Sequence, residues 1–181
     1  MEIKMREVIE RDKLYGYAVC KERMVELDIP RVGTFEKVSF EEFKKDMIEH
    51  LGAVVEGKDD IIQHMYDTIK IPERNHPDSA SYKFYTPFSF VPQTGNGIII
   101  PTGIKCKIEP GWLLQIFPPN QRGFKYGIEL YNTINVYDST NDEKHIILKI
   151  TTKTNENQEI INKNTVICQG VFLPYGLATN D

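Results

Sequence analysis

The spacing of apolar residues changes near residue 66 and divides the chain into two parts. Before this point apolar residues recur three and four positions apart, which indicates amphipathic helices. After it, β-branched and aromatic residues fill segments that Pro, Gly or Asn interrupts about every 8–12 residues, a pattern typical of a β barrel or sandwich. We therefore predict a helical extension over residues 1–65 and a mainly β domain, a barrel, over residues 66–181.

The strongest helix signal begins at Ser39. Ser39 and Glu42 form a capping box, in which a hydroxyl and a carboxylate bind free amides of the first helical turn. Five apolar residues then share one face, and Gly52 stands where a helix would end. The sequence predicts a helix over residues 39–51, whose apolar face consists of Phe40, Phe43, Met47, Ile48 and Leu51.

Two weaker helical patterns flank this segment. Residues 5–27 contain apolar residues at helical spacing, but Gly16 and its aromatic neighbours interrupt the pattern. Asp59 and Asp60 would place acidic groups at the positive end of a short helical turn that runs through Met65.

Eight segments of the second part have the composition of strands. Charged residues alternate with Ile104, Cys106 and Ile108, so one face of this strand is apolar and the other is exposed to solvent. The second face of the next strand is only partly polar, which indicates that the strand is covered by the barrel interior and by a neighbouring subunit or the N-terminal segment. Pro110 and Gly111 occupy the central positions of a type II turn between them. The predicted strands are 67–71, 82–86, 97–101, 103–109, 112–118, 125–131, 145–152 and 164–173.

Composition narrows the class of partner. The chain has 181 residues, with 22 Lys and Arg against 26 Asp and Glu, and a formal net charge of -4. This balance argues against a broad basic face for nucleic acid, whereas a nucleotide needs only a few donors. The sequence has no membrane-span pattern, no secretory signal, no disulfide framework and no metal-ligand cluster. We expect a cytoplasmic protein without a nucleic-acid or membrane partner.

Several segments of the predicted barrel carry a recognisable series of motifs. They are residues 71–74 with 79–82, residues 100–104 (Ile-Pro-Thr-Gly-Ile), residues 109–117, residues 132–139 (Asn-Thr-Ile-Asn-Val-Tyr-Asp-Ser) and residues 166–172 (Val-Ile-Cys-Gln-Gly-Val-Phe). In order and spacing they resemble the motifs of the trimeric deoxyuridine triphosphatase (dUTPase) family over about residues 66–173. Residues 38–43 also resemble the N-terminal helix of a bacterial branch of that family.

The resemblance implies a fold, an assembly and a reaction. The fold would be a jelly-roll-like β barrel, and the assembly a homotrimer whose active sites lie at subunit contacts. The reaction would be hydrolysis of dUTP, a deoxyuridine nucleotide, to dUMP and pyrophosphate, with Mg²⁺ held on the nucleotide phosphates. Water would be the nucleophile, oriented by a carboxylate, while side chains grip the phosphates.

Three residues match functional positions of the family. Asp138 falls where the family places its water-orienting carboxylate, and Asn132 matches a position that reads the uracil edge. Gln169 matches the glutamine of the fourth motif, which helps to hold the nucleotide. Each residue also has a plainer interpretation: a turn-capping Asp, an Asn that closes a strand and a polar residue of an edge strand.

The motif whose side chains contact the nucleotide phosphates departs from the family pattern. Where the family has Pro-Arg-Ser, this chain has Pro118, Pro119 and Asn120. A bidentate, charge-assisted phosphate contact is therefore lost, because proline has neither a guanidinium nor a backbone N–H. Arg122 lies three residues beyond the matching arginine position and is a candidate replacement, with Asn120 in place of the usual serine hydroxyl.

Other positions of the motifs are also altered. Lys83 replaces an acid of the first motif and would either attract phosphate or act as a surface charge. Asn135 replaces a glycine that allows close approach to the base, and asparagine is the next most tolerant residue for positive φ. Tyr137 replaces a small aliphatic residue, Asn141 replaces a stacking tyrosine, and the glycine-rich C-terminal arm of the family is not recognisable.

The sequence therefore leaves several functions open. One is a divergent dUTP pyrophosphatase, whose Asp138, Asn132 and Gln169 would act together. Another is a degenerate module of the same fold that binds a nucleotide or a protein without hydrolysis. A third is a structural β trimer in which the N-terminal 65 residues carry the interaction. Pyrophosphate release from dUTP separates the first function from the others.

Overall fold

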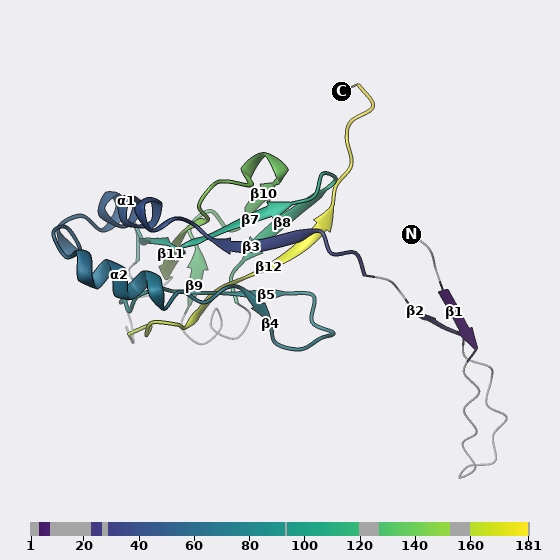
Figure 1. Cartoon of the computed structure of the whole chain (residues 1–181), viewed down its shortest axis with the longest axis horizontal. Helices are drawn as coiled ribbons and strands as arrows, with labels where there is room; N and C mark the ends of the chain where they lie inside the picture. Colours follow the sequence, from purple (N-terminus) through teal and green to yellow (C-terminus); the bar gives the residue numbers. More distant parts are fainter. Residues whose placement is uncertain are drawn as a thin grey trace, which may run out of the picture. The chain divides into compact units, whose positions relative to one another are not determined.

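The computed structural model describes residues 4–7, 23–26, 29–92, 94–119, 127–152 and 160–180. The chain divides into two compact units, Met1–Arg31 and Val32–Asp181. In the first unit, strands β1 (Lys4–Glu7) and β2 (Arg23–Glu26) pair antiparallel, with Met5 opposite Val25 (Figure 1). The weak helical pattern over 5–27 was therefore wrong at both of its ends, where strand pairing prevails; residues 8–22 lie outside the described part.

The second unit is mostly β, as predicted, and each pairing of its described strands is antiparallel. A five-stranded sheet has the order β10-β8-β12-β5-β4, a three-stranded sheet the order β6-β11-β9, and β3 pairs with β7. The strands are β3 (Gly33–Lys37), β4 (Glu73–Arg74), β5 (Tyr82–Tyr85), β6 (Ile98–Pro101), β7 (Ile104–Ile108), β8 (Trp112–Phe117), β9 (Ile128–Leu130), β10 (Asn135–Asp138), β11 (Ile147–Thr152) and β12 (Val166–Pro174).

The core lies between the inner faces of these sheets. Leu114 and Ile116 of β8 and Leu148 and Ile150 of β11 are fully buried. They alternate with more exposed neighbours, as expected for strands with one face on a core. Burial of each such side chain contributes about 1.5–3 kcal/mol. The predicted type II turn is also present, because Trp112 N donates to Glu109 O at 3.1 Å and Gly111 has a φ of 89°.

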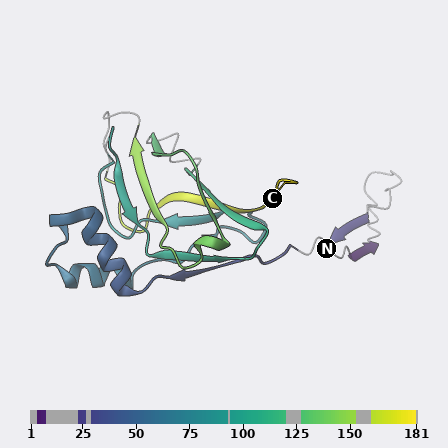
Figure 2. The ribbon, with the colours of Figure 1, turned by 90° about the horizontal axis from the view of Figure 1, so that it is seen from above.

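Two helices cover one end of the sheets (Figure 2). Helix α1 (Phe40–Leu51) begins as predicted, since Ser39 Oγ accepts a hydrogen bond from Glu42 N at 3.2 Å, and it ends at Gly52. A short 3-10 helix, Gly52–Val54, follows α1, and helix α2 then spans Asp59–Asp67. A second 3-10 helix, Ser139–Asn141, follows β10. Their apolar faces join the core through Phe43, Met47 and Ile62, each fully buried.

The predicted strand over 67–71 is wrong. Helix α2 continues to Asp67, and Thr68 Oγ1 then donates to His64 O at 2.8 Å. The hydroxyl of Tyr66 also donates to Val38 O at 2.7 Å. This bond ties the last turn of α2 to the segment between β3 and α1. These contacts stabilise the last turn of the helix. The β-branched residues Ile69 and Ile71 follow the helix without forming a strand, and the first strand of this region is β4.

Part of the predicted extension joins the sheets. Strand β3 pairs with β7 along its length, from Gly33 opposite Ile108 to Lys37 opposite Ile104. Strand β3 and both helices therefore belong to the same compact unit as the other strands of the sheets. The expected domain boundary near residue 65 stays a prediction. Among the described residues, no helix is long and apolar enough to cross a bilayer.

Candidate functional site

Asp138 ends β10 and caps the 3-10 helix Ser139–Asn141. Its Oδ1 accepts hydrogen bonds from Thr140 N at 2.9 Å and Thr140 Oγ1 at 2.6 Å, and Asp138 N donates to Asn141 Oδ1 at 3.1 Å. The Thr140 hydroxyl, together with its backbone N–H, lowers the pKa of the Asp138 carboxyl below its ordinary value. Asp138 is thus an ionised, turn-capping carboxylate at neutral pH, and both bonds to Thr140 use one of its two oxygens.

The turn between β9 and β10 places Asn132 beside Asn135. Asn132 is exposed, and its Nδ2 donates to Asn135 Oδ1 at 2.6 Å. Asn135 does not use the positive φ that asparagine tolerates: it lies in the extended strand β10, and Thr133 supplies the positive φ, at 66°. The left-handed residue is thus inside the turn, where it brings the two amides together.

Tyr137 extends this pair into the protein. Its hydroxyl donates to Ile147 O at 3.5 Å. Burial raises the pKa of Tyr137, and the Asn135 side chain opposes that rise. Asn135 and Tyr137 share one face of β10, so that with Asn132 they form a row of polar side chains, the polar chain, from the surface towards β11.

Asp138 faces away from this polar chain. Side chains alternate between the two faces of a strand. Asn135 is opposite the buried Ile116 of β8, whereas Asp138 is opposite Leu113, on the outward face of the five-stranded sheet. Residues 132, 135 and 137 thus lie together, and Asp138 is adjacent in sequence but on the other face.

Gln169 and Lys83 are neighbours in a different part of the same sheet. They are directly opposite each other in the β12–β5 pairing. Gln169 Nε2 donates to Pro118 O at 3.5 Å, and Lys83 Nζ donates to Asn75 Oδ1. Lys83 is thus held by the loop between β4 and β5, close to the glutamine of the fourth motif.

A single chain does not bring Asp138 and Gln169 together. They share the outward face of the sheet, but β8 lies between their strands. Along β8, Asp138 pairs with Leu113, whereas Gln169 pairs with Phe117, four residues further on. This offset corresponds to roughly 16 Å between their backbones. Two predicted site residues, Asn120 and Arg122, lie outside the described residues. The described part of this segment ends at Pro119, which is buried.

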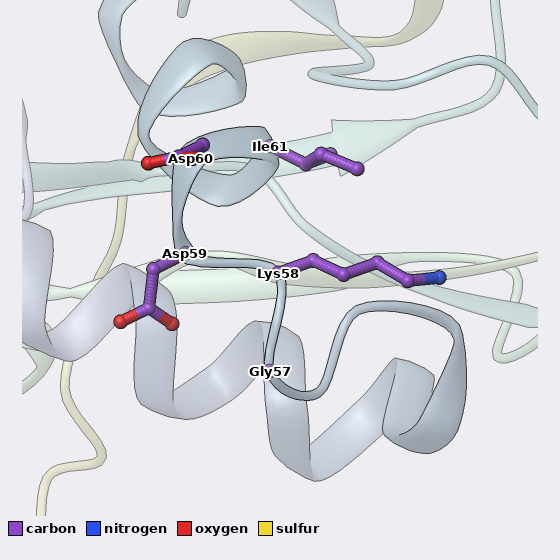
Figure 3. A pocket seen from close by; sticks show the side chains of 5 residues that line it. All are labelled: Gly57, Lys58, Asp59, Asp60 and Ile61. Atoms are coloured by element: carbon purple, nitrogen blue, oxygen red, sulfur yellow. The ribbon is translucent and has the colours of Figure 1, made fainter.

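Among the described residues, neither a hollow nor a cluster of metal-ligating side chains lies at these residues. A shallow hollow at the start of α2 is lined by residues 57–61, from Gly57 to Ile61, and by none of the predicted residues (Figure 3). Within the described ranges, no three His, Cys, Asp or Glu side chains are grouped as metal ligands. Sequence reasoning missed Thr140 as a partner of Asp138, although Asp followed by Ser, Thr and Asn is a turn signal.

Comparisons with known proteins find similarity to dUTPases. No family model matches the chain. It is 28% identical over 134 residues to the deoxyuridine 5'-triphosphate nucleotidohydrolase of Lactococcus lactis, which covers 70% of this chain and 87% of that protein. The dUTPase of Streptococcus mutans has a similar structure, with a TM-score of 0.51 and 27% identity over 60% of this chain and 88% of that one.

More distant structures share the fold. A dUTPase mutant of Staphylococcus bacteriophage 80alpha, solved with dUpNHpp, has a TM-score of 0.53 and 16% identity over 60% of this chain and 78% of that one. A dUTPase mutant of phage phi11 of S. aureus, which coordinates a structural Mg(II) ion, has a TM-score of 0.52 and 16% identity, over 60% of this chain and 86% of that one. Together with the motif series and the antiparallel jelly-roll-like sheets, these similarities support a member of the dUTPase family.

Proposed function

We propose that this protein hydrolyses dUTP to dUMP and pyrophosphate in the cytoplasm. The observation that carries the proposal is its similarity over 134 residues to a deoxyuridine 5'-triphosphate nucleotidohydrolase. In this proposal, the ionised Asp138 orients the attacking water, Asn132 contacts the base and Gln169 holds the nucleotide. Positioning of the water and neutralisation of developing charge are the main requirements of phosphoryl transfer.

The proposed site is shared between protomers of a homotrimer. The separation of Asp138 from Gln169 within one chain supports this arrangement, because residues that are roughly 16 Å apart cannot both contact one phosphate group. Exposed apolar residues beside Asp138 provide a contact surface: Val136 is 56% exposed and Leu173 is 38% exposed. Light scattering should give three times the chain mass.

The phosphates require positive charge that the usual arginine does not supply here. Lys83 lies beside Gln169, and Arg122 follows the altered grip, so we propose that these two side chains, with Asn120, replace it. Mg²⁺ would be held on the phosphates of the nucleotide, which requires no protein ligand cluster. When bound, the ion neutralises negative charge on the leaving pyrophosphate.

A second candidate function is nucleotide binding without hydrolysis. Two observations favour it. Thr140 donates two hydrogen bonds to one oxygen of Asp138, and the buried Pro119 occupies the position of the arginine that would contact phosphate. A module of this kind would retain the base contact and lose the rate acceleration, because charge-assisted phosphate contacts act mainly on the transition state.

Steady-state pyrophosphate release from dUTP with Mg²⁺ tests the proposal. Asp138→Asn removes the charge but keeps a good N-cap residue, so the turn should survive. Release by the wild type and a loss of about 100-fold or more in the variant are expected. Asp60→Asn, an exposed acid at the start of α2, is the matched control and should retain activity.

The other outcomes separate the two candidates. If the wild type releases no pyrophosphate but a non-hydrolysable dUTP analogue raises its melting temperature, the binding module is correct. If neither release nor a thermal shift occurs, both candidates are wrong.

A further inference from the structure

The turn that carries Asp138 is organised by its own residues. Asp138 Oδ1 accepts both hydrogen bonds from Thr140, and Asn141 Oδ1 accepts the Asp138 N–H at 3.1 Å. These bonds fix the carboxylate relative to the turn. They do not fix the turn relative to the sheets, because their donors and acceptors all belong to residues 138–141.

Strand β7 attaches this turn to the sheets. One edge of β7 pairs with β3, and Glu109, directly after the strand, donates its N–H to Val32 O at 2.9 Å on that side. The backbone groups of a strand point alternately to its two edges. The N–H of the preceding residue, Ile108, is therefore directed to the other edge, where it donates to Asp142 Oδ1 at 2.9 Å.

The segment that follows the turn runs along the same edge of β7. Ile104 O accepts from Ile146 N at 2.8 Å, and Lys105 Nζ donates to Glu143 Oε2 at 2.5 Å. The Glu143 side chain is 73% exposed, and an ion pair with so exposed an acid contributes little. The backbone bond at Ile146 lies further along the chain, beyond residues that are free to move with the turn.

Asp142 is therefore the attachment nearest to the turn. It directly follows the 3-10 helix Ser139–Asn141, and its side chain is half-buried. Its donor belongs to Ile108, which is only 3% exposed. Water replaces an acceptor poorly at such a place, so the bond from Ile108 to Asp142 determines where the turn lies on β7.

We propose that Asp142 is a positioning residue for Asp138: by accepting the Ile108 N–H, it fixes the turn on β7 and thereby the direction of the Asp138 carboxylate. The inference rests on the proposed function, in which Asp138 orients the attacking water. Both bonds from Thr140 use Oδ1, so Oδ2 is the oxygen for that water. A displacement of about 1 Å in such a group can cost about 100-fold in rate.

The pKa of Asp138 tests this role without any turnover. The Thr140 hydroxyl and N–H, together with the charge of Lys144, lower this pKa. If Asp142→Ala releases the turn, these interactions weaken and the Asp138 pKa rises towards its ordinary value. Loss of a nearby negative charge would by itself lower the pKa, so the sign of the change separates positioning from electrostatics. Carbon-13 NMR of labelled aspartate gives the value, and Asp138→Asn assigns the signal.

Turnover provides the second measurement. Asp142→Ala should lower kcat for pyrophosphate release from dUTP by about 10-fold to 100-fold. It should leave KM nearly unchanged, because Asp142 contacts no substrate in this proposal. Asp142→Asn keeps the Oδ1 acceptor and should preserve both kcat and the Asp138 pKa. Asp142→Leu, which has a similar volume and no acceptor, repeats the test if the alanine variant unfolds.

Thr86→Ala separates positioning from a general loss of stability. Its buried hydroxyl donates to Phe88 O at 2.6 Å. Thr86 follows β5 at the Val166 end of β12, whereas Asp138 lies at the Leu173 end of the same strand. This variant should lower the melting temperature but leave the Asp138 pKa and kcat unchanged.

The outcomes distinguish this inference from the proposed function. If folded Asp142→Ala has an Asp138 pKa equal to or below that of the wild type, or if Asp142→Asn behaves like Asp142→Ala, the positioning role is overturned and the proposed function stands. If the wild type releases no pyrophosphate, the proposed hydrolysis fails. The pKa comparison then still decides whether Asp142 positions Asp138.

Discussion

His145 Nδ1 lies 2.6 Å from Asp46 Oδ2 and ties helix α1 to the sheets. The other ring nitrogen, Nε2, accepts the backbone N–H of Gly103 at 2.6 Å. Because Nε2 accepts, the ring proton sits on Nδ1 and is donated to Asp46. The His145 side chain is only 3% exposed, so one buried imidazole joins the helix, the turn before β7 and the segment before β11.

Loss of the Asp46 carboxylate should destabilise the protein. Asp46→Ala leaves the buried Nδ1–H of His145 without its acceptor, which costs about 1–3 kcal/mol of unfolding free energy. Urea unfolding measures the change. Glu49→Ala removes an exposed carboxylate from the same helix and should stay within about 0.5 kcal/mol of the wild type. Equal stability of the two variants would contradict the role of the buried pair.

The same histidine should make stability depend on pH. Burial lowers the pKa of His145 below its ordinary value of 6.5, against the opposing effects of Asp46 and Glu42 and together with that of His50. The unfolded chain therefore binds a proton more readily than the folded chain. Above pH 6.5 the histidine is neutral in both states and takes nothing from the unfolding free energy. As the pH drops below that value, the unfolded chain takes up a proton and the unfolding free energy falls.

Unfolding midpoints between pH 7.5 and about pH 5 test this linkage. His145→Gln lacks the titrating group and should show a smaller decrease over the same range, whatever its stability at neutral pH. A parallel decrease in the wild type and the variant would assign the pH dependence to other groups.

Gly103 should tolerate a side chain poorly. Its φ is +75°, and an added Cβ would collide with Ile69 Cδ1 and lie 3.4 Å from Phe43 Cδ2. Gly57 has a similar φ of +73° but open space around the added atom. Gly57→Ala should therefore cost only the backbone strain, about 1–2 kcal/mol, and Gly103→Ala clearly more. Denaturant unfolding compares them, and equal losses would show that the collision is relieved without cost.

The two described cysteines should be unreactive in the folded protein. Burial raises the pKa of Cys106 to about 12 and also raises the pKa of Cys168. Because the thiolate is the nucleophile, iodoacetamide at pH 8 should label neither residue until a denaturant is added. Mass spectrometry of the peptides gives the result, and rapid labelling of Cys168 in the native state would contradict its burial in the core.

Local signals explain which elements could be predicted from the sequence. Helix 39–51 was predicted because Ser39 and Gly52 mark its two ends within the segment itself. Strand β3 was not, because its partner β7 is distant along the chain. The predicted strand over 67–71 failed because Tyr66 reaches back to Val38, a tertiary contact that local propensity does not contain.

The site was predicted as separate residues, without the links between them. The bond from Asn132 to Asn135 depends on the positive φ of Thr133, which is rare for a β-branched residue and has no local sequence signal. The cap that Asp138 forms by accepting from Thr140 could have been anticipated, because short polar residues after an aspartate favour such turns. The distance between Asp138 and Gln169 could not be predicted, because it depends on the register of the three strands β10, β8 and β12.

A crystal structure of the protein with a non-hydrolysable dUTP analogue and Mg²⁺ tests the central claim most directly. We expect a trimer in which the uracil edge contacts Asn132, and in which Asp138 of one protomer and Gln169 of another approach the same nucleotide. An analogue bound elsewhere, such as in the hollow at the start of α2, or contacts from Asp138 and Gln169 to different molecules, would contradict the account.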